Sequence, residues 1–209
     1  MGGSVLARLV IVSNRVAIPG DRALKAGGLA VARKESLGPT GGLWFGWSGQ
    51  IVAKPPANPK RISAEGMDYA ALDLSPEEHE TYYAGFSNAT LWPLFHYRLG
   101  LIDFRRAQLK GYLAVNARYA QALVELIRPD DTIWVHDYHF IPLAEMLRRL
   151  GVKNPIGFFL HIPFPAPEVL SALPGHEQLT HSLLAYDLVG FQTEIDRQQI
   201  TSGDHDHLP

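Results

Sequence analysis

The chain has 209 residues, of which 46% are hydrophobic and 19% are charged, and it contains no cysteine. This is the composition of an ordinary globular protein, and it excludes disulfide bonds and thiolate metal sites. The formal net charge of −2 gives no electrostatic reason to expect nucleic acid as a partner, and no apolar run is long enough to cross a bilayer. We therefore expect no membrane partner, and the lack of cysteine fits a reducing, cytoplasmic location.

Four short apolar runs have the length and the composition of buried β-strands. They lie near residues 9–12, 133–135, 156–160 and 187–191. Helical patterns separate the later runs. Strand–helix alternation with continuously apolar strands predicts an α/β fold in which helices cover both faces of a parallel sheet.

Polar side chains follow each of these runs at its carboxyl end. Parallel strands share one carboxyl edge, and open α/β sheets place their ligands there, so we expect these side chains to gather along one rim. The residues concerned are Arg15, His136, Asp137, His139, His161 and Gln192.

The rim residues alone are compatible with three hypotheses. Histidine and aspartate are metal ligands, which allows metal-dependent hydrolysis, but His136 and Asp137 point to opposite faces if the strand persists. Group transfer from a phosphorylated or nucleotide donor would use Gly27–Gly28 near a helix start for phosphate and Arg15 for an anion. A non-catalytic sugar-phosphate sensor is the third hypothesis.

The middle of the chain contains two predicted helices and two less regular stretches. Ser75 and Glu78 form a capping box that begins the first helix, and an apolar face over residues 115–126 defines the second. Glycines alternate with large aromatic residues over 41–49, which predicts an edge strand or hairpin beside a site. The prolines of residues 51–63 predict a surface loop.

Seven ordered stretches closely resemble the trehalose-6-phosphate synthases, over about residues 8–197. They are VSNR at 12–15, AGGL at 26–29, GLWFGW at 42–47, LWPLFHYR at 91–98, WVHDYH at 134–139, GFFLHIPFP at 157–165 and DLVGFQTE at 187–194. That family has the two-domain GT-B glycosyltransferase fold, with the active site between two Rossmann-like halves. The resemblance implies that this chain forms the N-terminal half, a Rossmann-like parallel sheet.

The resemblance also implies an activity and roles for individual residues. Glucose would be transferred from a nucleotide sugar, with UDP-glucose expected, to glucose 6-phosphate, with retention of configuration and without a metal or other cofactor. Carried over position by position, Arg15 and Tyr83 bind the acceptor phosphate, Asp137 binds acceptor hydroxyls, and Trp92 forms part of the pocket wall. An arginine fork suits a phosphate dianion, so physical chemistry agrees with the first assignment.

On the donor side, the resemblance places Gly27–Gly28 against the diphosphate through backbone N–H groups and His161 against the donor glucose. Glycine lets the backbone approach a diphosphate closely. Asp137 and His161 are thus the expected catalytic residues. We expect His136 and His139 to support them by packing or hydrogen bonding rather than to bind a metal.

The expected domain organisation is an incomplete, acceptor-side domain over residues 1–197 and a divergent, disordered tail over 198–209. The nucleotide-sugar domain that follows in the family is expected to be absent, so we expect the chain alone to be inactive. With its domain-facing surface open, the chain should be sticky and marginally stable. The aromatic residues expected near that surface are Trp44, Trp47, Trp92 and Phe164.

Overall fold

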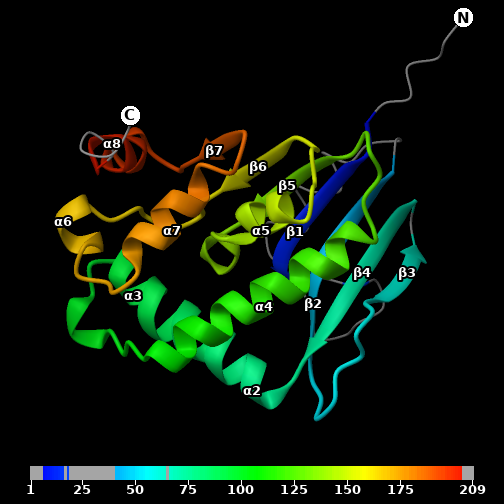
Figure 1. The fold of residues 1–209 in the computed structure, drawn as a ribbon, viewed down its shortest axis with the longest axis horizontal. Helices are drawn as coiled ribbons and strands as arrows, with labels where there is room; N and C mark the ends of the chain where they lie inside the picture. The colour runs from blue at the N-terminus through cyan, green and yellow to red at the C-terminus, as the bar shows by residue number, and fades with distance from the viewer. Residues whose placement is uncertain (1–6, 17, 19–40, 65, 204–209) are drawn as a thin grey trace, which may run out of the picture.

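The computed structural model describes residues 7–203 except 17, 19–40 and 65, with only the backbone of 201–203. Its centre is a seven-stranded sheet with the order β3-β4-β2-β1-β5-β6-β7 (Figure 1). All neighbouring strands are parallel except the antiparallel pair β3–β4. The strands are β1 (Leu9–Arg15), β2 (Gly42–Ile51), β3 (Lys60–Ala64), β4 (Met67–Leu74), β5 (Thr132–His136), β6 (Ile156–Phe159) and β7 (Leu188–Gly190).

The four predicted parallel strands are confirmed as β1, β5, β6 and β7, which are consecutive neighbours in the sheet. Two predictions for the intervening segments are wrong. Residues 42–51 form β2, which lies between β4 and β1 rather than at an edge, because its residues 42–47 are buried on both faces. Residues 60–64, expected in a loop, form the exposed antiparallel edge strand β3.

The helical elements lie mainly on one side of the sheet, and Figure 1 shows α4, α5 and α7 in front of it. The residues of the crossover from β1 to β2 fall mostly outside the described residues, so helical cover of the second face is not described. The helical elements are α2 (Pro76–Glu78), the π-helix η2 (His79–Leu91), α3 (Trp92–Phe95), η3 (Leu99–Leu101), α4 (Arg106–Val124), η4 (Tyr138–Phe140), α5 (Leu143–Arg149), α6 (Pro167–Leu170), α7 (His176–Leu183) and α8 (Glu194–Gly203).

Local sequence signals explain where two of these helices begin. The predicted capping box of α2 is confirmed: Glu78 N donates to Ser75 Oγ at 3.1 Å, and Ser75 N donates to Glu78 Oε2 at 2.8 Å. The backbone N–H of Asp196 donates to Thr193 Oγ1 at 3.2 Å at the start of α8. Helix α8 then continues to Gly203, past the boundary expected at residue 197. None of the helices in the described ranges is long and apolar enough to cross a bilayer.

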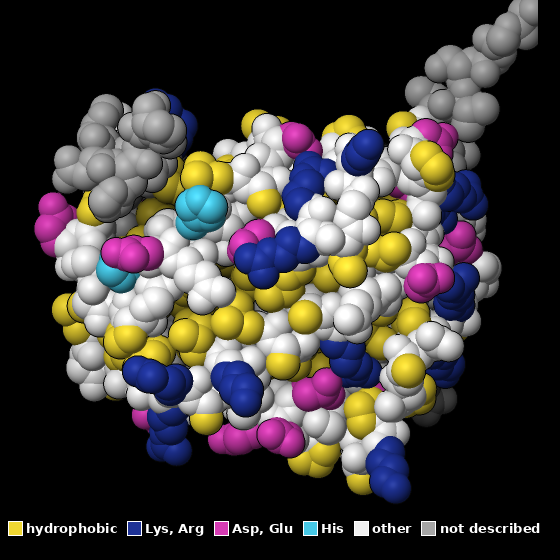
Figure 2. Space-filling model, viewed as in Figure 1, with side chains coloured by type: hydrophobic (Ala, Val, Ile, Leu, Met, Phe, Trp, Pro, Cys, Tyr) yellow, Lys and Arg dark blue, Asp and Glu magenta, His cyan; other side chains and the backbone are white. Residues whose placement is uncertain are grey.

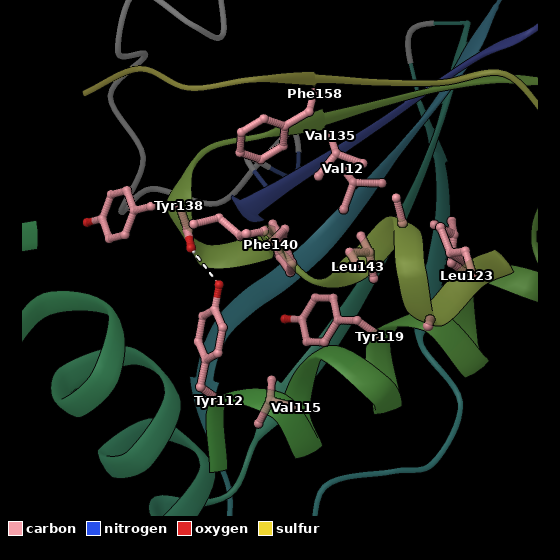
Figure 3. Packing of buried hydrophobic residues seen from close by; sticks show 14 of the residues in the cluster. Val12, Tyr112, Val115, Tyr119, Leu123, Val135, Tyr138, Phe140, Leu143 and Phe158 are labelled. Atoms are coloured by element: carbon pink, nitrogen blue, oxygen red, sulfur yellow. Dashed lines mark hydrogen bonds between the residues drawn. The ribbon is translucent and has the colours of Figure 1, made fainter. Parts of the chain in front are cut away.

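The main hydrophobic core lies between the sheet and the helices in front of it. Figure 3 shows Val12 and Val135 of the sheet facing Tyr119 of α4 and Leu143 of α5. Side chains alternate between the two faces of a strand, so Ile11, the residue before Val12, packs in a smaller cluster on the opposite face. Both faces of β1 are therefore buried, which explains its continuous apolar sequence.

Of the four aromatic residues expected near the open surface, only one is itself exposed. Trp44, Trp47 and Phe164 are only 6%, 4% and 4% exposed, whereas Trp92 is 40% exposed. The first two belong to the interior strand β2, and Phe164 packs edge-on against Phe95 at 5.7 Å between ring centroids. The front face carries scattered hydrophobic side chains between charges of both signs (Figure 2).

Candidate functional site

Four of the predicted rim residues are joined by hydrogen bonds at the carboxyl edge of β5 and β6. His136 Nδ1 and His161 Nε2 are 2.9 Å apart. Asp137 Oδ1 accepts the backbone N–H of His161 at 3.3 Å and that of Tyr138 at 3.1 Å. Gln192 Nε2 donates to the His161 carbonyl oxygen at 2.8 Å. The predicted gathering of these side chains is present in the structure.

The turn that carries Asp137 is held in place by three side chains. Asp137 itself has φ 78°, which is uncommon for a residue other than glycine. The three carbonyl groups of residues 138–140 each accept a hydrogen bond: Tyr112 Oη donates at 2.7 Å, Asn116 Nδ2 at 3.0 Å and Tyr186 Oη at 2.7 Å. Figure 3 shows the first of these bonds. These three hydrogen bonds stabilise the turn, as a strained backbone conformation at a functional position requires.

A row of rings connects Arg15 with this turn. The guanidinium carbon of Arg15 lies 4.9 Å from the ring centroid of Trp47, which lies 5.3 Å from that of Tyr83. The ring of Tyr83 stacks on His139 at 5.9 Å. Arg15 and Tyr83, predicted to act together, thus both lie against the buried ring of Trp47. A Cβ on Gly49 would lie 1.9 Å from Arg15 Nη1, so this glycine leaves the space that the guanidinium fills.

The exposed Trp92 indole stacks on His96 with ring centroids 4.1 Å apart. His96 Nδ1 lies 2.7 Å from the Trp92 carbonyl oxygen. Because a carbonyl oxygen only accepts, His96 Nδ1 carries the proton of this bond. His96 is also an electrostatic neighbour of Asp137, so this aromatic pair lies near the rim.

Burial has opposite effects on the ionisation of two rim residues. It raises the pKa of the Asp137 carboxyl above its ordinary value, and the hydrogen bonds from the backbone N–H groups of Tyr138 and His161 oppose this shift. Burial lowers the pKa of His139 to about 3, so its ring is neutral near pH 7. Neither ring nitrogen of His139 has a hydrogen-bond partner within the described residues. His139 therefore acts as a packing support, as expected.

The described residues contain no group of three or more His, Asp or Glu side chains placed to hold a metal ion. The geometry therefore offers nothing to support the hydrolase hypothesis. Gly27 and Gly28, predicted to meet the donor diphosphate, lie outside the described residues.

Three residues beside the site were not predicted as part of it: Trp47, Gly49 and His96. The alternation of glycine and tryptophan over 41–49 indicated a site nearby, but it did not identify which residues reach it. His96 lies in the stretch LWPLFHYR at 91–98, in which only Trp92 was assigned a role.

Together these features define a Rossmann-like α/β domain whose carboxyl rim presents an arginine, a carboxylate and aromatic side chains, a combination that fits a phosphorylated, hydroxyl-rich ligand. A family model described as glycosyltransferase family 20 matches residues 8–202. The chain belongs to glycosyltransferase family 20.

Several proteins similar to this chain are trehalose-phosphate synthases. A trehalose-6-phosphate synthase from Klebsiella pneumoniae is 54% identical over 192 residues, which is 92% of this chain and 40% of the relative. The crystal structure of an alpha,alpha-trehalose-phosphate synthase (UDP-forming) from Burkholderia vietnamiensis matches with a TM-score of 0.91 and 52% identity, over 96% of this chain and 44% of that one. A Burkholderia xenovorans homologue in complex with glucose-6-phosphate matches with a TM-score of 0.86 and 50% identity, over 96% and 43%.

Proposed function

We propose that this chain forms the acceptor-side half of a retaining glycosyltransferase that moves glucose from UDP-glucose to glucose 6-phosphate, giving trehalose 6-phosphate. The observation that carries this proposal is that the Arg15 guanidinium and the Tyr83 ring both lie against Trp47, on the rim that also carries Asp137. A planar guanidinium forms paired hydrogen bonds with phosphate, and a carboxylate accepts hydrogen bonds from sugar hydroxyls. The solved relative with bound glucose-6-phosphate supports the same acceptor.

In this proposal, Arg15 and Tyr83 bind the phosphate, Trp92 forms a wall, and Asp137 orients the acceptor hydroxyls. Orienting the acceptor beside the donor lowers the entropic part of the barrier. His161 contacts the donor glucose, and the backbone of Gly27–Gly28 contacts the diphosphate. The leaving diphosphate is stabilised by N–H dipoles and cationic side chains, so no metal or other cofactor takes part.

The chain spans 40% of the length of the Klebsiella relative, so binding and transfer are separate questions. We propose that residues 1–197 form the acceptor-side domain and that transfer needs a nucleotide-sugar domain such as the rest of the relatives would supply. A sugar-phosphate-binding domain without transfer activity is the second candidate. The proposal includes a cytoplasmic location, which the cysteine-free sequence fits.

Calorimetric titration of the chain with glucose 6-phosphate tests the proposed acceptor site. We expect saturable heat for the wild type and a loss of affinity of about tenfold or more for Arg15→Ala, since a charge-assisted bidentate contact is removed. Arg149→Ala is the matched control, because its side chain is 71% exposed on α5, and it should bind as the wild type does. Equal affinities for the two variants, or no heat with the wild type, would contradict the proposal.

The variant Asp137→Asn separates substrate binding from folding. Burial raises the pKa of this carboxyl, so the neutral form is favoured in the folded chain and ionisation above that pKa costs stability. We expect the variant to melt at a higher temperature than the wild type at pH 7, with the difference shrinking as the pH falls below the folded-state pKa. It should nevertheless bind glucose 6-phosphate more weakly. A lower melting temperature of the variant at pH 7 would refute the idea that burial of the ionised Asp137 carboxylate destabilises the fold.

A further inference from the structure

The ring of His136 is placed to control the ring of His161. His136 is the last residue of β5 and is only 5% exposed, while His161 follows β6 and is partly exposed. Their rings lie nearly parallel at 24°, with centroids 5.2 Å apart, and His136 Nδ1 is 2.9 Å from His161 Nε2. Trp134 packs against the His136 ring at 4.7 Å, which limits its movement.

The contacts of the His161 backbone do not by themselves orient its ring. Its N–H donates to Asp137 and its carbonyl oxygen accepts from Gln192, which fixes the main chain after β6. The side-chain torsions still allow the imidazole to rotate. Phe159 contacts the ring edge-on at 4.8 Å, and such a contact does not distinguish one ring nitrogen from the other. The hydrogen bond to His136 does distinguish them.

We propose that His136 is a positioning residue that holds His161 in one rotamer and one tautomer. A neutral imidazole has one N–H and one lone pair, so one of the two facing nitrogens donates and the other accepts. This choice decides whether the second ring nitrogen of His161 is a donor or an acceptor, and a flip of the ring would break the bond. The consequence for catalysis rests on the proposed function, in which His161 contacts the donor glucose. A hydroxyl group of that sugar then pairs with a ring nitrogen that is fixed either as a hydrogen-bond donor or as an acceptor.

Two substitutions of His136 test this inference. The side-chain amide of asparagine reaches about the position of imidazole Nδ1, whereas that of glutamine reaches about the position of Nε2. His136→Asn therefore keeps a partner for His161 Nε2, and His136→Gln moves the polar group away. The readout is the ¹⁵N spectrum of the His161 ring, recorded on the whole chain without ligand, at a pH above the ordinary pKa of histidine.

We expect two well-separated ¹⁵N shifts for His161 in the wild type and in His136→Asn, as a single tautomer requires. In His136→Gln the two shifts should converge through tautomer exchange. Averaged shifts in the wild type would overturn the proposal without any variant, and so would separated shifts in both variants.

Titration with UDP-glucose tests the functional consequence separately. We expect an affinity about tenfold lower in His136→Gln and within about twofold of the wild type in His136→Asn. If the spectra behave as expected while the wild type and both variants bind UDP-glucose equally well, the donor contact assigned to His161 is wrong and the pairing of the two rings stands.

Discussion

At the scale of single residues, the site depends on a glycine, Gly49, whose lack of a side chain leaves space for Arg15. Gly49 has φ +87°, and an added Cβ would overlap the Arg15 guanidinium. The glycine thus has two roles: it accommodates an uncommon backbone conformation and it leaves the space in which the arginine lies over Trp47.

The variant Gly49→Ala should therefore displace Arg15 and weaken binding of glucose 6-phosphate by about tenfold or more, measured by calorimetry. The matched control is Gly66→Ala, because Gly66 also has a positive φ of +78°, but a Cβ added there would meet no atom of the described residues within 4 Å, its chain neighbours aside. Both variants should lose a similar amount of stability from backbone strain. Normal binding by Gly49→Ala would show that Arg15 does not need this space.

His139 should make the fold sensitive to acid. Burial lowers its folded-state pKa to about 3, while the unfolded chain has the ordinary value near 6.5, so the unfolded state binds more protons between these values. Stability is therefore lost as the pH falls through this window, by at most about 1.4 kcal/mol per pH unit for one proton. His139→Phe should keep the stacking on Tyr83, flatten this dependence and add about 1–3 kcal/mol at pH 7, where it removes unpaired buried nitrogens.

Denaturant unfolding at several pH values measures both effects. The control is Tyr119→Phe, which removes another buried polar atom without a hydrogen-bond partner in the described part of the chain. Its hydroxyl does not gain or lose a proton in acid, so this variant should shift the stability curve without flattening it. If the free energy of unfolding falls equally steeply with decreasing pH in the wild type and in His139→Phe, the acid sensitivity does not come from His139.

At the scale of elements, the π-helix η2 lies unusually close to α4 because glycines face the contact. A Cβ on Gly111 of α4 would lie 2.1 Å from Thr81 Oγ1 and 2.3 Å from Thr81 Cβ. A Cβ on Gly85 of η2 would lie 2.7 Å from Gln108 Cδ. This approach brings Tyr83, on η2, to the ring of Trp47.

Gly111→Ala should destabilise the chain, although alanine is the better helix former by about 1 kcal/mol. The added methyl group overlaps an atom near the Thr81 backbone, and such overpacking costs about 1–3 kcal/mol. Thermal unfolding of the variant checks this. Gly100→Ala is the control and should change the melting temperature little, because a Cβ there meets no neighbouring atom within 4 Å in the described part of the chain. A stabilised Gly111→Ala would mean that the two helices separate at no cost.

At the scale of the whole molecule, one end of the sheet exposes apolar surface. A groove of ≈ 400 Å³ lies over β5, β6 and β7, with Trp134 and Leu188 in its lining. Leu188, on the terminal strand β7, is 71% exposed, and Trp134 is 37% exposed. Because Trp44, Trp47 and Phe164 are buried, we predict that any self-association uses this groove instead.

We expect the wild-type chain to self-associate as its concentration rises, because an apolar surface of this kind is covered favourably by another molecule. Leu188→Lys should reduce the association seen by sedimentation velocity. Leu101→Lys is the control, since Leu101 is 60% exposed on η3, away from the groove. A wild-type chain that stays monomeric at every concentration would refute this prediction.

The sequence predicted the strands β1, β5, β6 and β7, the capping box of α2 and the rim residues beyond the strands. These features are local: an apolar run of strand length, a Ser–Glu spacing and a polar residue at a strand end each carry their own physical signal. Parallel pairing then requires the carboxyl ends to meet. Family resemblance added roles for Arg15, Tyr83, Trp92, Asp137 and His161, and these roles stay predictions.

What only the tertiary structure decided depends on contacts between distant parts of the chain. The interior position of β2, the space for Arg15 at Gly49 and the pairing of His136 with His161 each join residues more than 20 positions apart. A run of alternating glycine and tryptophan fits an edge strand and an interior strand equally well until its neighbours are known. The sequence by itself thus determined which residues reach the rim, while the packing of strands and helices decided which of them touch.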